Sequence, residues 1–538
     1  MSDAAALPSR SAPAAPARPM VQPGASEAHF TTRRLAAFIF MVFGMFMAIL
    51  DIQIVSASLS QIQAGLSASS DEITWVQTSY LIAEVVMIPL SGFLSRVVST
   101  RVIFTISAGG FTLMSFMCAQ ANTIEQMILW RALQGFIGGG MIPTVFASAF
   151  TIFPRSKQPL IGPIIGLVAT LAPTIGPTVG GYLTDLFSWH WLFLVNIVPG
   201  IIVTAAAWLL IDFDEPDWSL LTHFDYFGLL AMAGFLGALE YALEEGPSKD
   251  WLQSGPVTWA IVISATSGVA FFVRMFTARQ PIVDLTTFRD RNFWTGTVFG
   301  FVLGIGLYGL TYIYPVYLAV VRGYSSLMIG KTMFVTGVCM FLTAPFAGRL
   351  MTRIDARVMI AVGFSLFAVG TYQASFVTVD WDFWELLWPQ VFRGVGLMLS
   401  MVPINFLALG TLPPSKIKNA SGLYNLMRNL GGAVGLALIN TMIDKRMDLH
   451  LERLRESVTW SRPVVTESLA GMAAALADRG SDAELAATRQ LALIVRRQAE
   501  VLAISDVFLA LTVIFLGCVS LAALMHKPVA AGGGGGGH

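Results

Sequence analysis

Three ionisable residues, Asp51, Glu84 and Arg131, lie within long runs of apolar residues. Asp51 stands in "FMAILDIQIVSASL" (46–59), and the apolar run continues on both sides of it. A charge inside a membrane span is costly and is by default a candidate for function, as in proton relays. A nearby opposite charge favours the ionised form of a carboxylate, whereas burial favours the neutral form. We therefore expect these three residues to couple proton movement, and Asp51 to face a polar cavity.

The positions in the chain place Asp51 and Arg131 at a similar depth. If the first span enters lipid near Leu35, Asp51 lies roughly 24 Å along it at about 1.5 Å per residue. The fourth span runs the other way, and Arg131 lies about 9 Å from its start, so the two charges could pair. Glu84 lies roughly 15 Å down the second span, nearer the middle. A static Asp51–Arg131 pair, and a Glu84 bonded to its own helix, are the alternatives. Which carboxylate takes the proton stays open.

The composition indicates a protein with many membrane spans. Of 538 residues, 55% are hydrophobic and 12% are charged, whereas soluble chains carry about 25% charged residues. Repeated apolar runs of about 20 residues have the length that crosses a bilayer core of roughly 30 Å. A backbone in lipid must form helices or a closed barrel, and these runs do not alternate as barrel strands do. We predict an all-α membrane protein in the lipid bilayer.

The charge balance and the cysteines bear on which partners and cofactors are expected. Lys and Arg together number 33, and Asp and Glu together also number 33. The net charge therefore gives no information about partners. We expect no nucleic acid to bind. Cys118, Cys339 and Cys518 lie in apolar runs and are interpreted as small hydrophobic residues. We expect no disulfide, no metal and no cofactor.

Fourteen spans are predicted, with both termini on the inner side. Short loops rich in Lys and Arg mark the inner side of a membrane, and here they alternate with acidic outer loops. The inner segment "DFDEPDWS" (212–219) departs from this rule. The spans lie near 35–59, 73–95, 102–121, 125–149, 158–183, 190–211, 225–243, 256–277, 294–318, 327–350, 357–378, 384–409, 419–443 and 502–525.

Three segments lie outside the spans. Residues 1–34 are rich in Pro, Ala and Ser, and we expect a disordered cytoplasmic tail. Residues 527–538 form a Gly-rich tail, either native or from cloning. Residues 444–501 form a long outer loop whose composition favours helix, and we expect amphipathic helices packed on the outer face. A docking surface for a partner and a simple folded loop are equally open.

The chain contains an internal repeat. "PLSGFLSRVVSTRVIF" (89–104) matches "PFAGRLMTRIDARVMI" (345–360) without a gap, and "LWRALQGFIGGGMIP" (129–143) loosely matches "PQVFRGVGLMLSMVP" (389–403). Two related halves, with matches in the same order, are typical of a transporter built by duplication. We predict six-helix bundles at 35–211 and 280–526, with an extra helix pair at 212–279 between them.

Four motifs between residues 50 and 183 carry a resemblance to a known family. They are "LDIQIVSASL", "GFLSRVVSTRV", "RALQGFIGGGMIP" and "LAPTIGPTVGGYL". Together they resemble the signature set of the major facilitator superfamily, and most of all its fourteen-span drug/proton antiporters of the EmrB/QacA type. "WHWLFLVNIVPG" (189–200), "QPIVDLTTFRDRNF" (280–293), the long outer loop and the Gly-rich tail are similar to the EmrB permeases. The resemblance implies the major facilitator fold with fourteen transmembrane helices.

The motif "LAPTIGPTVGGYL" predicts a bent and closely packed fifth span. Gly176, Gly180 and Gly181 allow helix backbones to approach, and Pro173 and Pro177 remove backbone donors and bend the helix. Such a helix suits a hinge between half-domains, although a plain packing helix is the alternative. In the family this stretch is the antiporter motif, which favours export.

The two repeated loops are predicted to form gates. In the family, an acid follows the glycine of the first loop, but here Ser95 takes the acid's place while Gly92, Arg96 and Arg101 remain. The charge lock that helps hold the inner gate of the family is therefore in doubt in this half.

The second loop keeps an acid between arginines. "GRLMTRIDARVM" (348–359) contains Gly348, Asp355 and Arg357, and a gate salt bridge or a solvated basic loop would fit it.

Several residues of the second half are candidates for a substrate cavity. Tyr308 and Tyr312 lie in the ninth span, which borders the cavity in this fold, and could stack against amphipathic compounds. Tyr314 fits an interfacial position equally well. The remaining candidates are Asn405, Asn425 and Arg428. Glu240, near the outer end of the seventh span, is expected at the membrane interface.

These features indicate a transporter. No GxxxxGK[ST] motif is present, so active transport must draw on an ion gradient. We expect proton-coupled export of hydrophobic or amphipathic compounds across a bacterial inner membrane by alternating access. A specific exporter of a lipid, siderophore or metabolite is the alternative.

The scattered histidines form no catalytic cluster, so we do not expect an enzyme. Resemblance to EmrB implies a periplasmic membrane-fusion adaptor (EmrA-like) and an outer-membrane channel (TolC-like) as partners.

Overall fold

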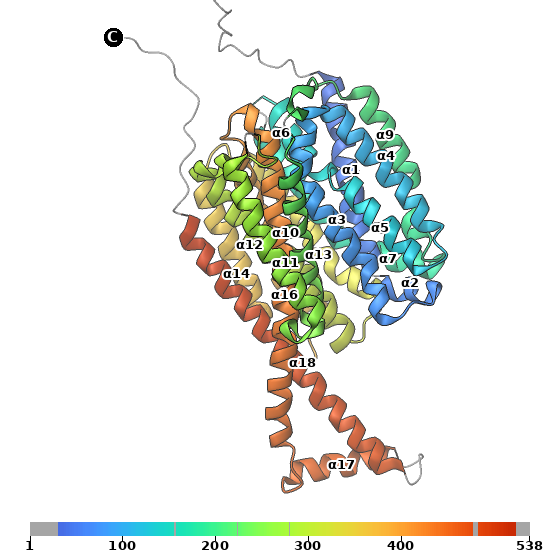
Figure 1. Ribbon diagram of the computed structural model, residues 1–538. Coiled ribbons are helices and arrows are strands. Elements are labelled where there is room, and N and C mark those ends of the chain that lie inside the picture. Colours follow the sequence, from blue (N-terminus) through green and yellow to red (C-terminus); the bar gives the residue numbers. More distant parts are fainter. Residues whose placement is uncertain are drawn as a thin grey trace, which may run out of the picture.

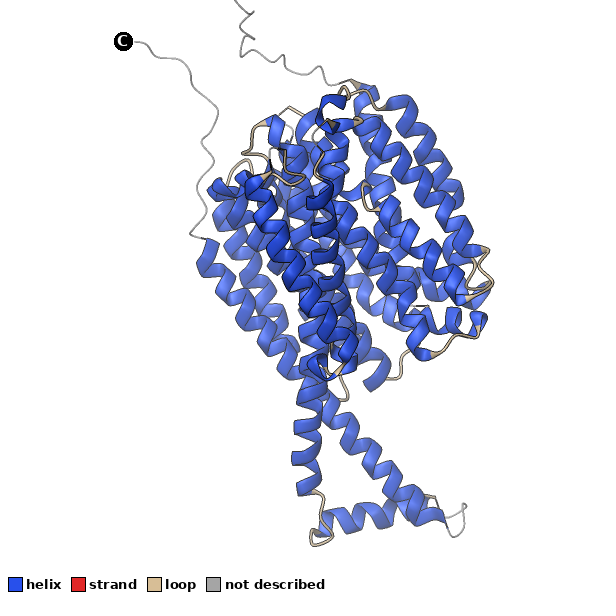
Figure 2. Cartoon of the chain, in the orientation of Figure 1, coloured by secondary structure: helices blue, strands red, loops and turns tan. Residues whose placement is uncertain are grey.

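A computed structural model describes residues 31–522, except 57, 155–157, 223, 279 and 477–481. The predicted Gly-rich tail, and nearly all of the predicted N-terminal tail, lie outside the described residues. Every regular element in the described part is helical (Figure 2), which confirms the all-α class.

The α-helices follow the predicted apolar runs. Their bounds are α1 Thr32–Ser56, α2 Leu59–Leu66, α3 Ser70–Val97, α4 Thr100–Ala119, α5 Ile124–Gly138, α6 Met141–Ile152, α7 Gln158–Leu186, α8 Trp191–Leu194, α9 Ile197–Leu210, α10 Tyr226–Glu245, α11 Gly255–Thr277, α12 Arg291–Val316, α13 Ser326–Leu350, α14 Ala356–Ala374, α15 Phe383–Leu409, α16 Pro414–Ser457, α17 Pro463–Ala475 and α18 Ala483–Leu521.

Thirteen helices of the described part are long and apolar enough to cross a membrane, and the bent α7 makes fourteen. This agrees with the predicted number. The two parts of α7, Ile161–Pro173 and Ile175–Leu186, meet at 43°. The helix therefore bends at its central proline, as predicted from the loss of a backbone donor there.

The helices form two groups joined along their length (Figure 1). In the first group, α3 packs on α5, α4 on α5 and α9, and α1 on α7 and α9. In the second, α14 packs on α15 and α18, and α12 on α16. The groups meet where α7 contacts α13 and α15, and where α16 contacts α3 and α6. The extra pair, α10 and α11, packs together and reaches both groups through α3 and α16.

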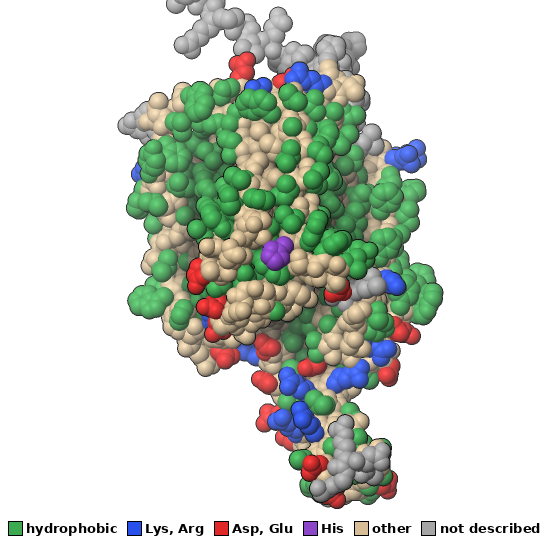
Figure 3. Space-filling model, turned by 90° about the vertical axis from the view of Figure 1, so that its right-hand side faces the viewer, with side chains coloured by type: hydrophobic (Ala, Val, Ile, Leu, Met, Phe, Trp, Pro, Cys, Tyr) green, Lys and Arg blue, Asp and Glu red, His purple; other side chains and the backbone are tan. Residues whose placement is uncertain are grey.

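The bundle has two distinct ends. The first turn of α1 and the last described turn of α18 lie at one end, uppermost in Figure 1, here called the α1 end. Hydrophobic side chains cover much of the band between the ends, whereas charged side chains gather near the ends and on a projection (Figure 3). An apolar band of this kind faces lipid in a membrane protein.

The predicted outer loop forms the projection. It is helical, as expected, but its helices are not packed on the face of the bundle, so that expectation is wrong. Instead α16 continues for 44 residues to Ser457, α18 already begins at Ala483, and α17 joins them at the tip (Figure 1). We call residues 444–501 the projecting hairpin, and the end that bears it the hairpin end. Two membrane helices that extend beyond the bundle hold α17 away from it.

Candidate functional site

Asp51 and Arg131 form an ion pair inside the first group of helices. Arg131 Nη1 lies 2.6 Å from Asp51 Oδ2, and both side chains are fully buried. The two residues come from α1 and α5, so the pair joins helices that are distant in the sequence. The prediction that they lie at one depth and pair is confirmed.

Two amides complete this polar cluster. Asn196, at the start of α9, donates to the other oxygen of Asp51 at 2.7 Å. Arg131 also donates to Gln134 Oε1 at 2.7 Å, and its guanidinium lies 4.2 Å from the centre of the Tyr80 ring. Sequence reasoning missed Asn196 and Gln134. Both stand in motifs that it had singled out, and Gln134 follows Arg131 by three positions, which places them on one helix face.

The cluster is closed off from the cavity that lies between the two groups of helices. Both Asp51 oxygens have protein partners, and the side chain has no exposed surface. The expectation that Asp51 faces a polar cavity is therefore wrong. Its neighbours Ile52 and Gln53 line the cavity instead. The geometry fits the alternative in which the pair holds helices together.

The cavity lies between the two groups, toward the hairpin end, and has a volume of about 450 Å³. It is bounded by the later parts of α1, α10 and α12, the first half of α3, the start of α13 and the middle of α16. All these segments are nearer the hairpin end, given the directions in which their helices run. The α1 end is closed by contacts between the groups, such as the 2.6 Å bond from Ser421 Oγ to Pro143 O.

Three carboxylic acids line the cavity. They are Glu84, Glu240 and Glu244, and the residues lining this cavity include no Lys or Arg. Glu84 is 3% exposed, and its Oε1 has no hydrogen-bond partner among the described residues. Glu240 is 6% exposed, so the expectation that it lies at the membrane interface is wrong. A count of residues from the span's end gives depth but not the direction in which a side chain points.

Aromatic side chains form part of the opposite wall. Tyr308 and Tyr312 of α12 both line the cavity, as expected, and Tyr308 Oη donates to Asn429 Oδ1 at 3.4 Å. Tyr314 is instead buried in the second group, where its ring lies 5.1 Å from that of Phe508. The interfacial alternative for Tyr314 is wrong.

The other three predicted cavity residues are buried but are not part of this lining. Asn405, Asn425 and Arg428 are at most 2% exposed. Asn425 donates to the carbonyl of Ser421, one turn earlier on α16, at 2.9 Å. Arg428 lies over the ring of Phe146 at 5.1 Å. Its charge, like that of Arg131, acts on Glu84, so it contributes to the electrostatics of the cavity from behind the wall.

A third buried arginine, Arg393, was missed. Arg393 of α15 is 2% exposed and donates to Thr311 Oγ1 at 2.8 Å, and Thr311 itself lines the cavity. The guanidinium also lies 5.5 Å from the centre of the Tyr314 ring. The signal was an arginine in an apolar span, the same signal that identified Arg131 in the first half.

The motif of α7 forms the seam between α1 and the second group. A Cβ atom on Gly180 would lie 2.8 Å from the carbonyl oxygen of Ile54, and Gly176 is in similar contact with Gln53 of α1. Pro177 lines the cavity, and Gly181 is buried. The predicted close packing of this bent helix is confirmed, and the helix contacts both groups.

Comparison with known proteins agrees with this architecture. The family model of the Major Facilitator Superfamily matches residues 41–436. The chain belongs to the major facilitator superfamily.

EmrB proteins are among its relatives. The colistin resistance protein EmrB of Acinetobacter baumannii is 43% identical over 91% of this chain and 96% of its own length. The fatty acid resistance protein FarB of Neisseria gonorrhoeae is 30% identical over 92% and 96%. The multidrug export protein EmrB of Escherichia coli is 27% identical over 91% and 95%. Within the superfamily, the chain is of the EmrB type.

Solved structures support the same fold. The human organic anion transporter TETRAN matches with a TM-score of 0.54 at 11% identity, over 90% of this chain and 99% of that one. The nucleoside transporter NupG matches with a TM-score of 0.52 at 12% identity, over 91% and 99%. Family membership and fold together make the protein a multi-pass membrane transporter of the major facilitator type.

The gate loops of this superfamily member differ between the halves. In the second loop, Arg357 Nη2 lies 2.9 Å from Asp355 Oδ2. The pair therefore lies within the loop itself. Asp355 also caps the start of α14. Gly348 lies in the last turn of the preceding helix, α13, which ends at Leu350. In the first loop, the Arg101 guanidinium lies 4.4 Å over the Trp208 ring.

Arg96 and Gly92 meet segments outside their own loop. The Arg96 carbonyl accepts a hydrogen bond of 3.1 Å from Asp217 N. A Cβ atom on Gly92 would lie 2.8 Å from the carbonyl oxygen of Lys418 on α16. The first loop is therefore in direct contact with the second group of helices. Among the described residues, no group of three or more His, Cys, Asp or Glu could hold a metal ion.

Proposed function

We propose that this transporter exports hydrophobic or amphipathic compounds in exchange for protons, and that Glu84 is the carboxyl group that exchanges the proton. The observation that carries the proposal is the position of Glu84, which lines the cavity with one oxygen free of protein partners. An ionisable residue at membrane depth that borders a cavity typically marks an ion or substrate pathway.

In this proposal, Asp51 sets the charge balance and does not carry the proton. Its carboxylate is held by Arg131 and Asn196, and releasing it would break two buried hydrogen bonds. Arg131 acts on both Asp51 and Glu84. Glu240 acts as a second cavity carboxyl near the entrance, since it lies further toward the hairpin end.

The geometry of the cavity supports the alternating-access part of the proposal. The cavity lies toward the hairpin end, while contacts between α16 and α3 close the α1 end. We take the hairpin end as the periplasmic side and the α1 end as the cytoplasmic side of a bacterial inner membrane, with both termini in the cytoplasm. The state described then faces outward, ready to release substrate and accept a proton.

The cavity wall suits the proposed substrates. Tyr308 and Tyr312 offer ring faces, and Ile52, Leu81 and Val316 are among the apolar residues beside them. Export of several amphipathic compounds is supported by relatives named for colistin and multidrug resistance. A specific exporter is the second candidate, favoured by the relative named for fatty acid resistance.

We further propose that the protein is the inner-membrane part of a tripartite pump, with a membrane-fusion adaptor and an outer-membrane channel. The projecting hairpin would dock the adaptor. It exposes large apolar side chains outside the membrane band, among them Trp460 and Val464 at 75% and 73%. Apolar groups that are exposed together in this way mark interaction sites.

Transport into energised inverted membrane vesicles tests the proton assignment. We expect Glu84→Gln to abolish drug uptake driven by a pH gradient while drug binding persists, since the cavity wall keeps its shape. Glu125→Gln, on an exposed first turn of α5, removes the same charge elsewhere and serves as the control. Full gradient-driven uptake by Glu84→Gln at normal abundance would refute the assignment.

A further inference from the structure

The first gate loop lacks the acid that its pattern predicts. Ser95 stands in that position, and its hydroxyl donates to the carbonyl of Gly92 at 3.2 Å, within its own helix. No negative charge of this loop is therefore available to hold the second group of helices at the α1 end. The contacts of the loop nevertheless include a carboxylate, supplied by a segment more than 100 residues away in the chain.

That carboxylate belongs to Asp214, in the linker between α9 and α10. Its oxygens accept hydrogen bonds from the backbone nitrogen of Thr100 at 2.9 and 3.1 Å, and from the Thr100 hydroxyl at 2.9 Å. Thr100 is the first residue of α4. A carboxylate at a helix start is stabilised by the unpaired N–H groups and by the helix dipole.

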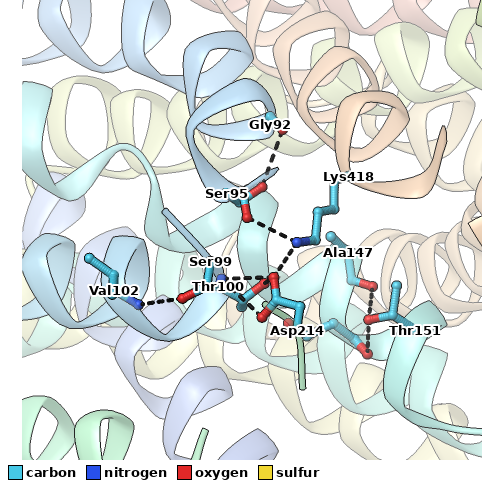
Figure 4. Close-up of polar contacts among 10 residues, drawn as sticks. Gly92, Ser95, Ser99, Thr100, Val102, Ala147, Thr151, Asp214 and Lys418 are labelled. Carbon is cyan, nitrogen blue, oxygen red and sulfur yellow. Dashed lines mark hydrogen bonds and ion pairs between the residues drawn. The ribbon is translucent and has the colours of Figure 1, made fainter. Parts of the chain in front are cut away.

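Asp214 also reaches the second group of helices. The ammonium group of Lys418, on the first turns of α16, forms an ion pair with Asp214 Oδ2. The same ammonium group donates to the carbonyl of Ser95 at 2.9 Å. Figure 4 shows Lys418 between Ser95 and Asp214, with Thr100 on the other side of the carboxylate. Both charged side chains are about one-fifth exposed, at 18% and 19%.

The backbones at this point are in contact. Gly92 lies against the carbonyl of Lys418, as described above, and a Cβ atom on Gly422 would lie 3.2 Å from the carbonyl oxygen of Ile88. The Lys418–Asp214 pair can form only while α3 and α16 stay this close. It must break if the two groups separate at the α1 end.

We propose that Asp214 is the gate acid of this transporter, a carboxylate from the linker that replaces the one missing at Ser95 and holds the α1 end closed by binding Lys418 and the start of α4. This assignment also accounts for an acidic linker on a side where basic residues are expected. Two other acids of the linker have different partners: Asp212 pairs with Arg33 of α1 at 3.3 Å, and Asp217 accepts a hydrogen bond from Ser219. Asp214 is a positioning residue, since it contacts the gate and not the cavity.

The test measures the opening of the α1 end directly. Spin labels are placed on the full-length protein in nanodiscs at Thr32→Cys and Thr352→Cys, one in each group of helices, with the three native cysteines replaced by alanine. Distance distributions between the labels then report the closed and open populations. Losing a hydrogen bond to a charged group corresponds to a shift of about tenfold or more in an equilibrium.

We expect Asp214→Asn and Lys418→Gln each to shift the equilibrium about tenfold toward the open form. The distance distribution between the labels then moves toward longer distances. Glu215→Gln, which removes an exposed charge from the next position, should leave it unchanged. Adding Ser95→Asp to Asp214→Asn should restore the short distance, because a carboxylate there lies beside Lys418.

Unchanged distributions in both Asp214→Asn and Lys418→Gln overturn the proposal, even if thermal stability falls. A shift that Ser95→Asp does not reverse overturns the claim that Asp214 replaces the missing acid. If Asp214→Asn does not fold, Lys418→Gln decides alone, because it removes the same ion pair from the other side; an unchanged distance distribution then overturns the proposal. The measurement uses no proton gradient or substrate, so its result is independent of whether Glu84 exchanges a proton.

Discussion

At the scale of single residues, the two carboxyl groups predicted to handle protons have opposite environments. Asp51 is saturated by Arg131 and Asn196 and is sealed in the first group of helices. Glu84 lines the cavity with a free oxygen. Both stood out for the same reason, a charge in an apolar run, and only the surrounding side chains distinguish a structural pair from an exchangeable acid.

The Asp51–Arg131 pair should be far more costly to break than to replace. Removing one partner of a buried ion pair leaves an uncompensated charge and costs about 3–5 kcal/mol, whereas replacing both partners can be nearly neutral. We expect Arg131→Gln, and likewise Asp51→Asn, to lower the melting temperature in detergent strongly. The double variant Asp51→Asn, Arg131→Gln should recover most of the loss, because an amide pair needs no charge compensation.

Thermal unfolding of the two single variants and the double variant, followed by intrinsic fluorescence, forms the mutant cycle. If the effects of the two single substitutions add up to that of the double variant, the residues do not depend on each other, and the structural role assigned to the pair is wrong.

At the scale of helices, α7 connects the sequence motif to the movement of the two groups. Gly166, in its first part, lies near Met398 of the second group, and Gly176 and Gly180, in its second part, lie against α1, with the 43° bend between the two parts. The motif's glycines stand where α7 touches α1, and one of its prolines stands at the bend. Residues chosen for their backbone properties thus shape the element that must tilt when access alternates.

Gly180→Ala should impair both transport and stability. Its Cβ atom would lie 2.8 Å from the Ile54 carbonyl oxygen and 3.1 Å from the Ile54 Cα atom, so α1 and α7 would have to separate. Gly162→Ala in the same helix is the matched control, since its Cβ atom would lie 3.9 Å from Val402. Alanine is favoured over glycine within a helix by roughly 0.5–1 kcal/mol.

Vesicle transport and melting temperature, measured on both variants at equal abundance, provide the comparison. Equal behaviour of the two alanine variants would show that the α1–α7 contact tolerates a methyl group, contrary to this packing.

The positions of the spans could be predicted from the sequence because each must supply about 20 apolar residues to cross lipid. The bend in α7 was predictable because proline acts locally. The arrangement of the segments outside the lipid could not be predicted in this way. The composition of residues 444–501 indicated helix but could not show that α16 and α18 continue into it.

The site was predictable to a smaller extent. Charges in apolar runs identified Asp51, Glu84 and Arg131, and the same signal was present at Arg393 and Glu240. Side-chain direction decided which of these residues reach the cavity, and a count along one helix does not give it. Asp214 was missed for a different reason, because it acts on residues that adjoin it only after the chain has folded.

At the scale of the whole molecule, the projecting hairpin is attached to the transport bundle but adds little to its packing. No residue of α17 is buried, and α17 packs mainly on α18. The bundle should therefore fold and transport without it. We expect replacement of residues 463–481 by a Gly/Ser segment of equal length to leave the melting temperature and drug uptake into inverted vesicles close to those of the unaltered protein.

The same replacement should abolish drug resistance in intact cells that carry the adaptor and the outer-membrane channel. The physical reason is that a flexible Gly/Ser segment presents no apolar surface to dock, while substrate still reaches the periplasm. Co-purification of a tagged adaptor with each form gives the direct measurement, and replacing the apolar Trp460 and Val464 by serine provides a smaller change with the same expected direction. Retained adaptor binding and full resistance would place the docking surface elsewhere. Loss of vesicle transport would instead show that the hairpin sets the positions of α16 and α18 inside the membrane, because these two helices form its base.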